Sequence, residues 1–495
     1  MNIELTPSLP GFQRFFAGRG NLSAKEEIRR EIERTMSRSL FGFAELFSHI
    51  LPSRLISNVF KRSNARARVY TGEATFWCFL RQVLNGNCAC GEAVRQLQAL
   101  RVEAGLPAQH PNSKAYCDAR AKLDLESLRE LAVGSGVKLD DGHAACNLWK
   151  SRKVKLLDGT SVSMPDTIEN QSEFPQPKQQ KCGCGFPVMN LVVLLSLATG
   201  AILDWDAGSK SEKSLWHNIM RSLSAGDVLL ADSGFFSFLG FVRLMRNGVD
   251  AVVRHTRSMH LELCEKSKTV WLGEGDRLVQ WRKPKCNSKT ASKEEWLSMP
   301  AIITLRIIEY TISAPGFRTS KVTLATTLLD SIAYPAEEIA SLYFDRWQIE
   351  LRIRDIKTTM RMDVLHCKTP AMIRKETTMF MLACNLIRAL LAEAASASGA
   401  KLLRLSFKAA MQQFNQWMGL LLSSARESLG KLRKTLRQFF DALAKSTLPY
   451  RPGRCEPRAV KRRPKPHCLL TAPRHQMVIK CHDSGSHKKY AIKYP

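Results

Sequence analysis

The sequence is poor in acidic residues and has no long apolar run, and both shortages limit what the protein can be. Asp and Glu number 45 against 74 Lys and Arg, a formal net charge of +29. Residues 1–20 lack the apolar core of a signal peptide. The longest uncharged stretch, residues 188–203, is interrupted by Asn190, Ser196 and Gly200, which predicts a buried β-hairpin rather than a membrane span. We therefore expect a cytoplasmic protein without a membrane partner.

Cysteine is present but lacks the spacing that binds zinc. The 14 cysteines include two close pairs, Cys88 with Cys90 and Cys182 with Cys184, each separated by one residue. Structural zinc sites usually have two to four residues between paired cysteines. Because no export signal is seen either, we expect reduced, mostly structural thiols and no zinc site. The irregular spacing of His and Cys between residues 467 and 487 indicates no metal site there.

What the chain has in excess is positive charge, on a sequence apolar enough to fold. Apolar residues make up 44% of 495, and the isoelectric point is near 9.8. This composition describes a well-cored globular protein with a cationic surface, as phosphate neutralisation requires. Ribosomal and membrane-surface proteins share such a surface, so charge alone does not identify the partner. The length predicts about three domains.

The most informative motif is a row of polar residues at helical spacing. We call these four the signature residues: Tyr343, Arg346, Glu350 and Lys357. At about 100° per residue, their offsets place them within about 60° of arc on one face of a helix. The apolar residues between them fall on other sides and can pack into a core. A carboxylate among cations suits a metal ion beside a phosphate, whereas the alternative is a solvated face with ordinary ion pairs.

Two further acids follow apolar segments that predict β-strands. Residues 154–157 lead into Asp158 and a glycine turn, and residues 228–231 lead into Asp232. We predict that both acids lie at or near strand ends, where a sheet holds them at fixed depth and a packed helix brings Glu350 beside them. The alternative for each Asp is an ordinary turn or helix N-cap residue.

Three converging carboxylates have a chemical consequence, because each raises the pKa of the others unless cations are present. Oxygen ligands beside phosphate favour Mg²⁺ or Mn²⁺ over zinc. Two such ions, about 3.5 to 4 Å apart, activate a water or a 3′-hydroxyl and stabilise the leaving oxygen of an in-line displacement. We therefore expect Asp158, Asp232 and Glu350 to be catalytic residues that hold two Mg²⁺ or Mn²⁺ ions.

These motifs together resemble a known family. Leu-Asp158-Gly-Thr, Leu-Ala-Asp232-Ser-Gly-Phe-Phe and the signature residues are similar to the DDE transposases of bacterial insertion sequences, in the group with the YREK signature, the insertion sequence four family. The resemblance spans about residues 154–375. One difference is Ser233, where the family often has Arg or Lys, so we infer no DNA contact at that position.

The resemblance implies roles for residues and a fold that hydrophobic periodicity alone does not predict. In the family the two Asp and the Glu bind the catalytic metals, which here are Asp158, Asp232 and Glu350. The residues that the resemblance assigns to DNA binding near the element's end are Tyr343, Arg346 and Lys357, with Trp347 beside Arg346. The implied fold class is α/β, with a ribonuclease-H-like catalytic core. The implied location is the bacterial nucleoid.

The expected organisation has four parts. Residues 1–150 form a helical N-terminal DNA-binding region, and residues 151–375 form the catalytic core with a β-rich insertion at about 257–330. A helical region follows at 376–450, and a basic, Pro-rich tail at 451–495 contacts DNA backbone without sequence preference. The insertion is inferred because 118 residues separate Asp232 from Glu350, too many for one strand and one helix.

Hydrophobic patterns predict the elements within these parts. The strands predicted for the insertion are at residues 260–265, 269–272, 278–282 and 302–310. The helices predicted for the flanking regions are at residues 23–50, 73–84, 91–100 and 113–122, and then at 378–394 and 402–443.

Two interpretations stay open within these parts. The basic residues of the N-terminal helices, Arg95, Arg101, Lys114, Arg120 and Lys122, belong either to a helix-turn-helix that recognises a specific DNA end or to an ordinary helical bundle with a basic exterior. The three tryptophans of the insertion, Trp271, Trp281 and Trp296, either stack on an unpaired base or lie in the core, and burial of at least two is favoured.

The predicted function is that of a DNA transposase. It binds the ends of its own insertion sequence, cleaves them with two metal ions, and transfers the 3′-hydroxyl ends into target DNA. By resemblance, the second strand is cleaved through a hairpin and a homodimer holds both ends of double-stranded DNA. Two alternatives remain: a structure-specific, metal-dependent nuclease with the same acids, and an inactive derivative that binds ends without cutting.

Overall fold

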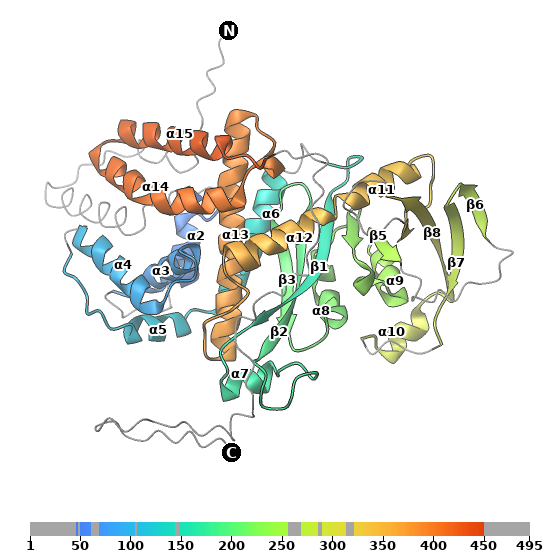
Figure 1. Ribbon diagram of the computed structural model, residues 1–495, viewed down its shortest axis with the longest axis horizontal. Coiled ribbons are helices and arrows are strands. Elements are labelled where there is room, and N and C mark those ends of the chain that lie inside the picture. Colours follow the sequence, from blue (N-terminus) through green and yellow to red (C-terminus); the bar gives the residue numbers. More distant parts are fainter. Residues whose placement is uncertain are drawn as a thin grey trace, which may run out of the picture.

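The computed structural model describes the chain at residues 46–47, 50–60, 69–103, 106–143, 148–255, 269–285, 290–312 and 321–449. Within these ranges the protein has a mixed α/β fold, with one sheet flanked by helices (Figure 1). The helix predicted from Ser23 to about Ile50 falls largely outside the described residues, as does the basic tail at 451–495.

The first five strands form the part of the sheet that carries the predicted acids. They are β1 (Val154–Ser163), β2 (Val188–Ser196), β3 (Ile202–Gly208), β4 (Val228–Ala231) and β5 (Asp250–His255). Their order is β3-β2-β1-β4-β5, with β1, β4 and β5 parallel and β2 antiparallel to both neighbours. β4 is apolar and buried throughout, as expected for a strand covered on both faces. The predicted hairpin at 188–203 is confirmed by β2 and β3.

The insertion contributes four more strands to the same sheet. They are β6 (Val270–Gly273), β7 (Asp276–Arg282), β8 (Ile302–Thr311) and β9 (Lys321–Thr326). β9 pairs antiparallel with β5, and β8, β7 and β6 follow outward, which gives nine strands. Strands predicted at 269–272, 278–282 and 302–310 are confirmed, and the one predicted at 260–265 lies outside the described residues. Trp281 and Trp296 are buried, whereas Trp271 is 65% exposed at the sheet edge.

The N-terminal helices pack as expected from their sequence pattern, with one addition. The described helices are α2 (Ser53–Phe60), α3 (Gly72–Leu84), α4 (Cys90–Glu103), α5 (Lys114–Ala121) and α6 (Leu125–His143). α3, α4 and α5 confirm the helices predicted at 73–84, 91–100 and 113–122, and α6 was not predicted. The side chain of Thr71 caps α3 by accepting a hydrogen bond from the backbone N–H of Ala74.

The long helix α13 (Pro370–Ser398) lies between the N-terminal helices and the sheet (Figure 1). It is long and apolar enough to cross a membrane. However, 94% of its most apolar stretch of 18 residues is buried inside the protein, as in a core helix. It is followed by α14 (Phe407–Glu427) and α15 (Leu429–Lys445). The single helix predicted over 402–443 was wrong, because Ser428 turns the chain and caps α15 through the N–H of Lys431.

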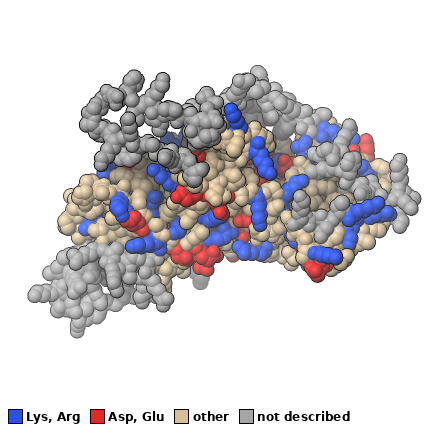
Figure 2. All heavy atoms as spheres, turned by 90° about the horizontal axis from the view of Figure 1, so that it is seen from below, with Lys and Arg blue, Asp and Glu red and all other residues tan. Residues whose placement is uncertain are grey.

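One hydrophobic core joins these regions. Buried side chains of the N-terminal helices, the sheet, the insertion and the C-terminal helices belong to one continuous cluster, from Leu46 to Leu443. A smaller cluster around Tyr70, Val94 and Tyr116 lies between α3, α4 and α5. The N-terminal helices are thus packed onto the sheet through a shared core. Outside this core, Lys and Arg side chains are spread along the face shown in Figure 2, and acidic side chains gather in smaller groups.

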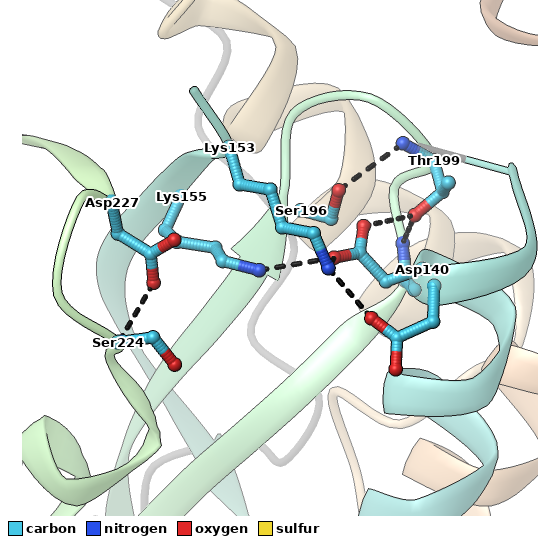
Figure 3. Close-up of polar contacts among 9 residues, drawn as sticks. Asp140, Lys153, Lys155, Ser196, Thr199, Ser224 and Asp227 are labelled. Atoms are coloured by element: carbon cyan, nitrogen blue, oxygen red, sulfur yellow. Dashed lines mark hydrogen bonds and ion pairs between the residues drawn. The ribbon is translucent and has the colours of Figure 1, made fainter. Parts of the chain in front are cut away.

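A buried charge network fastens α6 to the start of β1 (Figure 3). Lys155 donates a hydrogen bond to Asp140 at 3.0 Å, and both side chains are almost fully buried. The ammonium group of Lys153 lies 3.5 Å from Asp140, and Thr199 donates to the same carboxylate at 3.4 Å. Burial alone would raise the pKa of Asp140, but the two lysines and Ser196 hold it below its usual value.

Candidate active site

The two predicted aspartates lie next to each other where the parallel pairing of β1 and β4 stops. The last paired residues are Leu157 and Ala231, and Asp158 and Asp232 come directly after them. One carboxylate oxygen of Asp158 accepts a hydrogen bond from the N–H of Gly159 at 2.8 Å, and Asp232 accepts one from Ser233 at 2.7 Å. Adjacent parallel strands thus hold both carboxylates at the same depth in the sheet.

The strand around Asp158 differs from our prediction. β1 does not end in a glycine turn at Gly159 but continues to Ser163, still paired with β2. Asp158 is therefore inside a strand, at the point where its neighbour β4 stops. The prediction for Asp232 is closer, because β4 ends at Ala231 and a short 3₁₀ turn over Ser233–Phe235 follows.

The signature residues lie on a helical segment that is interrupted twice. α11 (Ala336–Phe344) carries Tyr343, α12 (Trp347–Arg354) carries Glu350, and a π-helical turn, η7 (Asp355–Thr359), carries Lys357. Arg346 precedes α12 with helical backbone angles. The prediction of a single regular helix over this segment is therefore wrong. The backbone nevertheless stays helical at both junctions, and α12 packs against β1.

Arg346 lies between two of the predicted acids. Its guanidinium nitrogens are 4.0 Å from a carboxylate oxygen of Asp158 and 3.5 Å from one of Glu350. The Arg346 side chain is only 11% exposed, and its guanidinium lies 5.6 Å from the centre of the Tyr343 ring. The helix thus brings a cation and a carboxylate together beside the aspartates.

The acids are close enough to affect each other's ionisation. Burial, chiefly, raises the pKa of Asp158 to about 6, and the charges of Asp232 and Glu350 raise it further against the opposing effects of Gly159 and Arg346. A carboxylate that is costly to ionise beside two others is relieved by a cation. This set of three carboxylates fits a hard divalent cation by its chemistry. Within the described ranges, however, no three His, Cys, Asp or Glu side chains are gathered closely enough to hold a metal ion as they stand.

The remaining signature residues make contacts inside the protein. The Tyr343 hydroxyl is buried and donates to the carbonyl of Ala231 at 3.2 Å, and burial raises its pKa well above the usual value. The Lys357 ammonium donates to the hydroxyl of Thr160 at 3.0 Å and to the carbonyl of Ser161 at 2.7 Å. Both residues therefore tie the signature segment to the strands that carry the aspartates.

The predicted DNA-binding residues differ in how they are placed. Trp347 is 46% exposed at the start of α12. Tyr343 has its hydroxyl bonded inside the protein, so a direct DNA contact through that hydroxyl does not fit this structure. In the N-terminal region Arg120 is buried, donates to Gln82 at 3.0 Å and lies over the ring of Phe79, which makes it a core residue. Lys114 is exposed and paired with Asp118.

Sequence reasoning missed one acid. Glu212 begins α8 (Glu212–Ile219), a helix that packs on β2 and β3, and its carboxylate lies against Gly159. Burial, and then the charge of Asp158, raises the pKa of Glu212. The available signal was Gly159 itself, because a glycine inside a strand often marks the close approach of another group. We interpreted that glycine as a turn.

The comparisons with known proteins identify a family to which the chain is similar. The family model described as "Transposase DDE domain" matches residues 149–386, which include Asp158, Asp232, Glu350 and Lys357. By these matches the chain is similar to the DDE transposases of the insertion sequence four family. It is 25% identical over 440 residues to Transposase InsG for insertion sequence element IS4 of Escherichia coli (strain K12), covering 87% of this chain and 94% of that protein.

A solved structure is also similar, but weakly. The cryo-EM structure of the piggyBac transposase synaptic complex with hairpin DNA matches over 80% of this chain and 84% of that chain, with 12% sequence identity and a TM-score of 0.40. The assignment as a DNA-cleaving and strand-transferring enzyme therefore depends on the family match and the Escherichia coli relative.

Proposed function

We propose that this transposase binds the ends of its own insertion sequence, cleaves the 3′ strand, and joins the freed 3′-hydroxyl to target DNA. The observation that carries the proposal is the position of Asp158 and Asp232 directly after the last paired residues of β1 and β4, with Glu350 and Arg346 held beside them by α12. A duplex that carries the inverted repeat next to the gene should be nicked at the element's 3′ end. Cleavage at random positions would contradict the proposal.

The core is proposed to be ribonuclease-H-like. The strand order β3-β2-β1-β4-β5, with only β2 antiparallel to both neighbours, supports this assignment, as does the placement of Asp158 in β1 and of Asp232 directly after the neighbouring β4. By this proposal the catalytic domain extends over about residues 151–375, with β6 to β9 as its insertion. Residues 1–150 and 376–450 form the flanking helical regions.

Asp158, Asp232 and Glu350 are proposed to hold the divalent cations that the family uses, here two Mg²⁺ or Mn²⁺ ions. When bound, these ions would activate a water or a 3′-hydroxyl and stabilise the leaving oxygen. The protein's own part is to hold three carboxylates at fixed depth. Arg346 lowers the pKa of Asp158 and so favours its ionised form. Tyr343 fixes α11 to the last residue of β4.

DNA is proposed to pass over the signature segment. Trp347 is exposed next to Arg346, and Lys357 lies beside Thr160 on the part of β1 that extends beyond Asp158. The wide distribution of Lys and Arg seen in Figure 2 supports further contacts with the backbone. Tyr343 is assigned a positioning role instead of a DNA contact. A homodimer that holds both ends, a hairpin intermediate and a place in the bacterial nucleoid complete the proposal.

Cleavage should require Mg²⁺ or Mn²⁺, and Ca²⁺ should support assembly of the end complex without chemistry. The larger ion tolerates loose coordination and positions the attacking oxygen poorly. Cleavage and gel-shift assays on one preparation, with each metal added after chelation, check this. Full activity in chelator, or activity with Zn²⁺ alone, would contradict it.

Arg346→Ala and Lys357→Ala should each weaken end binding and flatten its salt dependence. Each cation that neutralises a phosphate contributes about one to the slope of log affinity against log salt. Gel shifts across a salt series, with thermal melts beside them, measure this.

The matched control is Lys408→Ala, which removes an exposed charge from α14. Its salt slope should equal that of the wild type. If Arg346 and Lys357 act only as ion-pair and hydrogen-bond partners inside the protein, their slopes will also be unchanged and only the melting temperatures will fall.

A further inference from the structure

A large polar cavity lies between α8, α9 (Phe238–Arg246) and α10 (Lys293–Ser298). Its volume is about 790 Å³, and its described lining carries three cations, Lys210, Arg243 and Arg246, and one acid, Glu295. Three positive charges against one negative charge leave two uncompensated. Among these described lining residues, Met220 has the only apolar side chain. The cavity therefore suits an anionic ligand and not an apolar one.

Arg243 and Glu295 neutralise each other inside the cavity. Arg243 donates two hydrogen bonds to the Glu295 carboxylate, at 2.7 and 2.6 Å, and this partner lowers the pKa of Glu295. His217 adds no charge at pH 7, because burial, and then the charge of Arg243, lowers its pKa to about 4. The uncompensated charges are therefore those of Lys210 and Arg246.

Lys210 and Arg246 are both exposed side chains. Arg246 donates to the carbonyl and the hydroxyl of Ser298, at 2.7 and 3.3 Å, which fixes the guanidinium group without neutralising it. In the part of the chain that the structure describes, no carboxylate forms an ion pair with either cation. A guanidinium and an ammonium group without carboxylate partners suit a phosphate group.

The Lys210 side of the cavity lies at the same end of the sheet as Lys357. Asn190 of β2 donates to the carbonyl of Lys210 at 3.0 Å and is paired with Ser161 of β1, whose carbonyl accepts a hydrogen bond from Lys357 at 2.7 Å. Ser161 lies about 10 Å beyond Asp158, at about 3.3 Å per residue, and Lys210 is a further one to two strand spacings away, about 5 to 10 Å. The combined separation is about three to four base-pair steps of about 3.4 Å. DNA that meets Asp158 is therefore long enough to reach the cavity.

The cavity and the signature segment lie on opposite faces of β1. Side chains alternate along a strand, and a Cβ atom added to Gly159 would meet Glu212 of α8, whereas Thr160 accepts a hydrogen bond from Lys357. The element's end is proposed to occupy the face of the signature segment. The α8 face at the same end of the sheet is then left for the DNA to which that end is joined.

We propose that the cavity between α8 and α9 binds the phosphate backbone of the target DNA through Lys210 and Arg246. The inference rests on the proposed function, since it assumes that the signature segment holds the element's end and that joining takes place at Asp158. It assigns a partner to a surface that neither the signature residues nor the family resemblance covers.

The test joins pre-cut element ends to a plasmid with the full-length protein, at a series of plasmid concentrations. The double variant Lys210→Ala with Arg246→Ala removes both uncompensated cations. It should need at least about tenfold more plasmid for half-maximal joining, because each phosphate contact contributes about tenfold to affinity near 0.1 M salt. Joining at saturating plasmid and the gel-shift affinity for end DNA should equal those of the wild type. An unchanged dependence on plasmid concentration would overturn the proposal.

The matched control is Lys213→Ala, because Lys213 is exposed on the same helix but is not among the described lining residues. It should keep the wild-type dependence on plasmid. If it raises the plasmid requirement as much as the double variant does, the effect comes from general surface charge and the proposal fails. If the double variant weakens binding of end DNA and leaves the plasmid dependence unchanged, the cavity holds the element's end and the assignment to target DNA is wrong.

Glu295→Gln provides a change of opposite sign. It removes the acid of the lining and releases Arg243, so the plasmid concentration for half-maximal joining should fall. A concentration that stays the same or rises, in a variant that melts like the wild type, would contradict the proposal. Thermal melts on every variant show whether it is folded.

The wild-type reaction, measured in parallel, separates this inference from the function on which it rests. If the wild type joins pre-cut ends and the double variant joins them equally at every plasmid concentration, only the role of the cavity is wrong. If the wild type joins no pre-cut ends at all, the proposed function is wrong and the assignment of the cavity fails with it.

Discussion

Replacing Asp158 or Asp232 with Asn should abolish strand cleavage and leave DNA binding nearly unchanged. Each change removes the charge of a proposed metal ligand while keeping the size of the side chain. We expect a loss of more than about a hundredfold, because even groups that only support metal ligands cost 10- to 100-fold when removed. Cleavage and gel-shift assays on the same preparations measure both effects. Cleavage near the wild-type rate in either variant would contradict the assignment.

The control for this experiment is Asp441→Asn. Asp441 is exposed on α15, and it should tolerate the same change without loss of cleavage.

Stability provides a second check for Asp158. Its folded-state pKa of about 6 lies above the usual value near 3.9, so the stability cost of ionising Asp158 begins above about pH 4 and is complete above about pH 6. Metal-free Asp158→Asn should therefore melt at or above the wild-type temperature at pH 7, and the difference should vanish below about pH 4.

Lys155→Met should lower the free energy of unfolding by about 3 to 5 kcal/mol, the usual cost of leaving one member of a buried ion pair without its partner. The carboxylate of Asp140 is 2% exposed, so it would lose its nearest cation in a place that water does not reach. Chemical denaturation at pH 7 measures the change. A loss below about 1 kcal/mol would mean that the pair contributes no more than a surface ion pair.

Two further variants and the pH dependence show how much of the stability change comes from the ion pair of Asp140 with Lys155 and how much from its neighbours. Lys153→Met removes a more exposed lysine of the same network, 37% exposed, and should cost much less. Asp140→Leu combined with Lys155→Met should recover most of the lost stability, because both charges of the buried pair are then removed together. The folded-state pKa of Asp140 is depressed. The stability that Asp140 contributes is therefore present above about pH 4 and is lost as the pH falls further. Over that range, the difference in the free energy of unfolding between the wild type and Lys155→Met should become smaller.

The positions of the three proposed catalytic acids were predictable from sequence because local patterns point to them. Apolar runs before Asp158 and Asp232 predicted the strands, and helical spacing predicted that Arg346 and Glu350 share a face. The interruptions around this segment were not predictable, because the π-helical turn at η7 is stabilised by tertiary contacts such as Lys357 to Thr160.

Glycines account for the main errors in the strands and helices. Gly159 looked like a turn, but in the structure it makes room for Glu212. α6 was missed because glycines within it lower helix propensity. One of them, Gly136, lies where a Cβ atom would be 1.9 Å from the carbonyl oxygen of Ile202, so its role is close packing on β3. Burial of Tyr343 and the pairing of β9 with β5 likewise depend on contacts between distant segments, which local patterns do not encode.

The central claim is that Asp158, Asp232 and Glu350 form a centre that both cuts the element's end and joins it to another DNA. The most direct measurement incubates the protein with end DNA labelled at the strand whose 3′-hydroxyl is freed, a supercoiled plasmid and Mg²⁺. The account predicts labelled, joined plasmid with the wild-type protein and none with Asp158→Asn, Asp232→Asn or Glu350→Gln. Cut ends that never join the plasmid would indicate a nuclease, and joined products that persist in these variants would place the chemistry elsewhere.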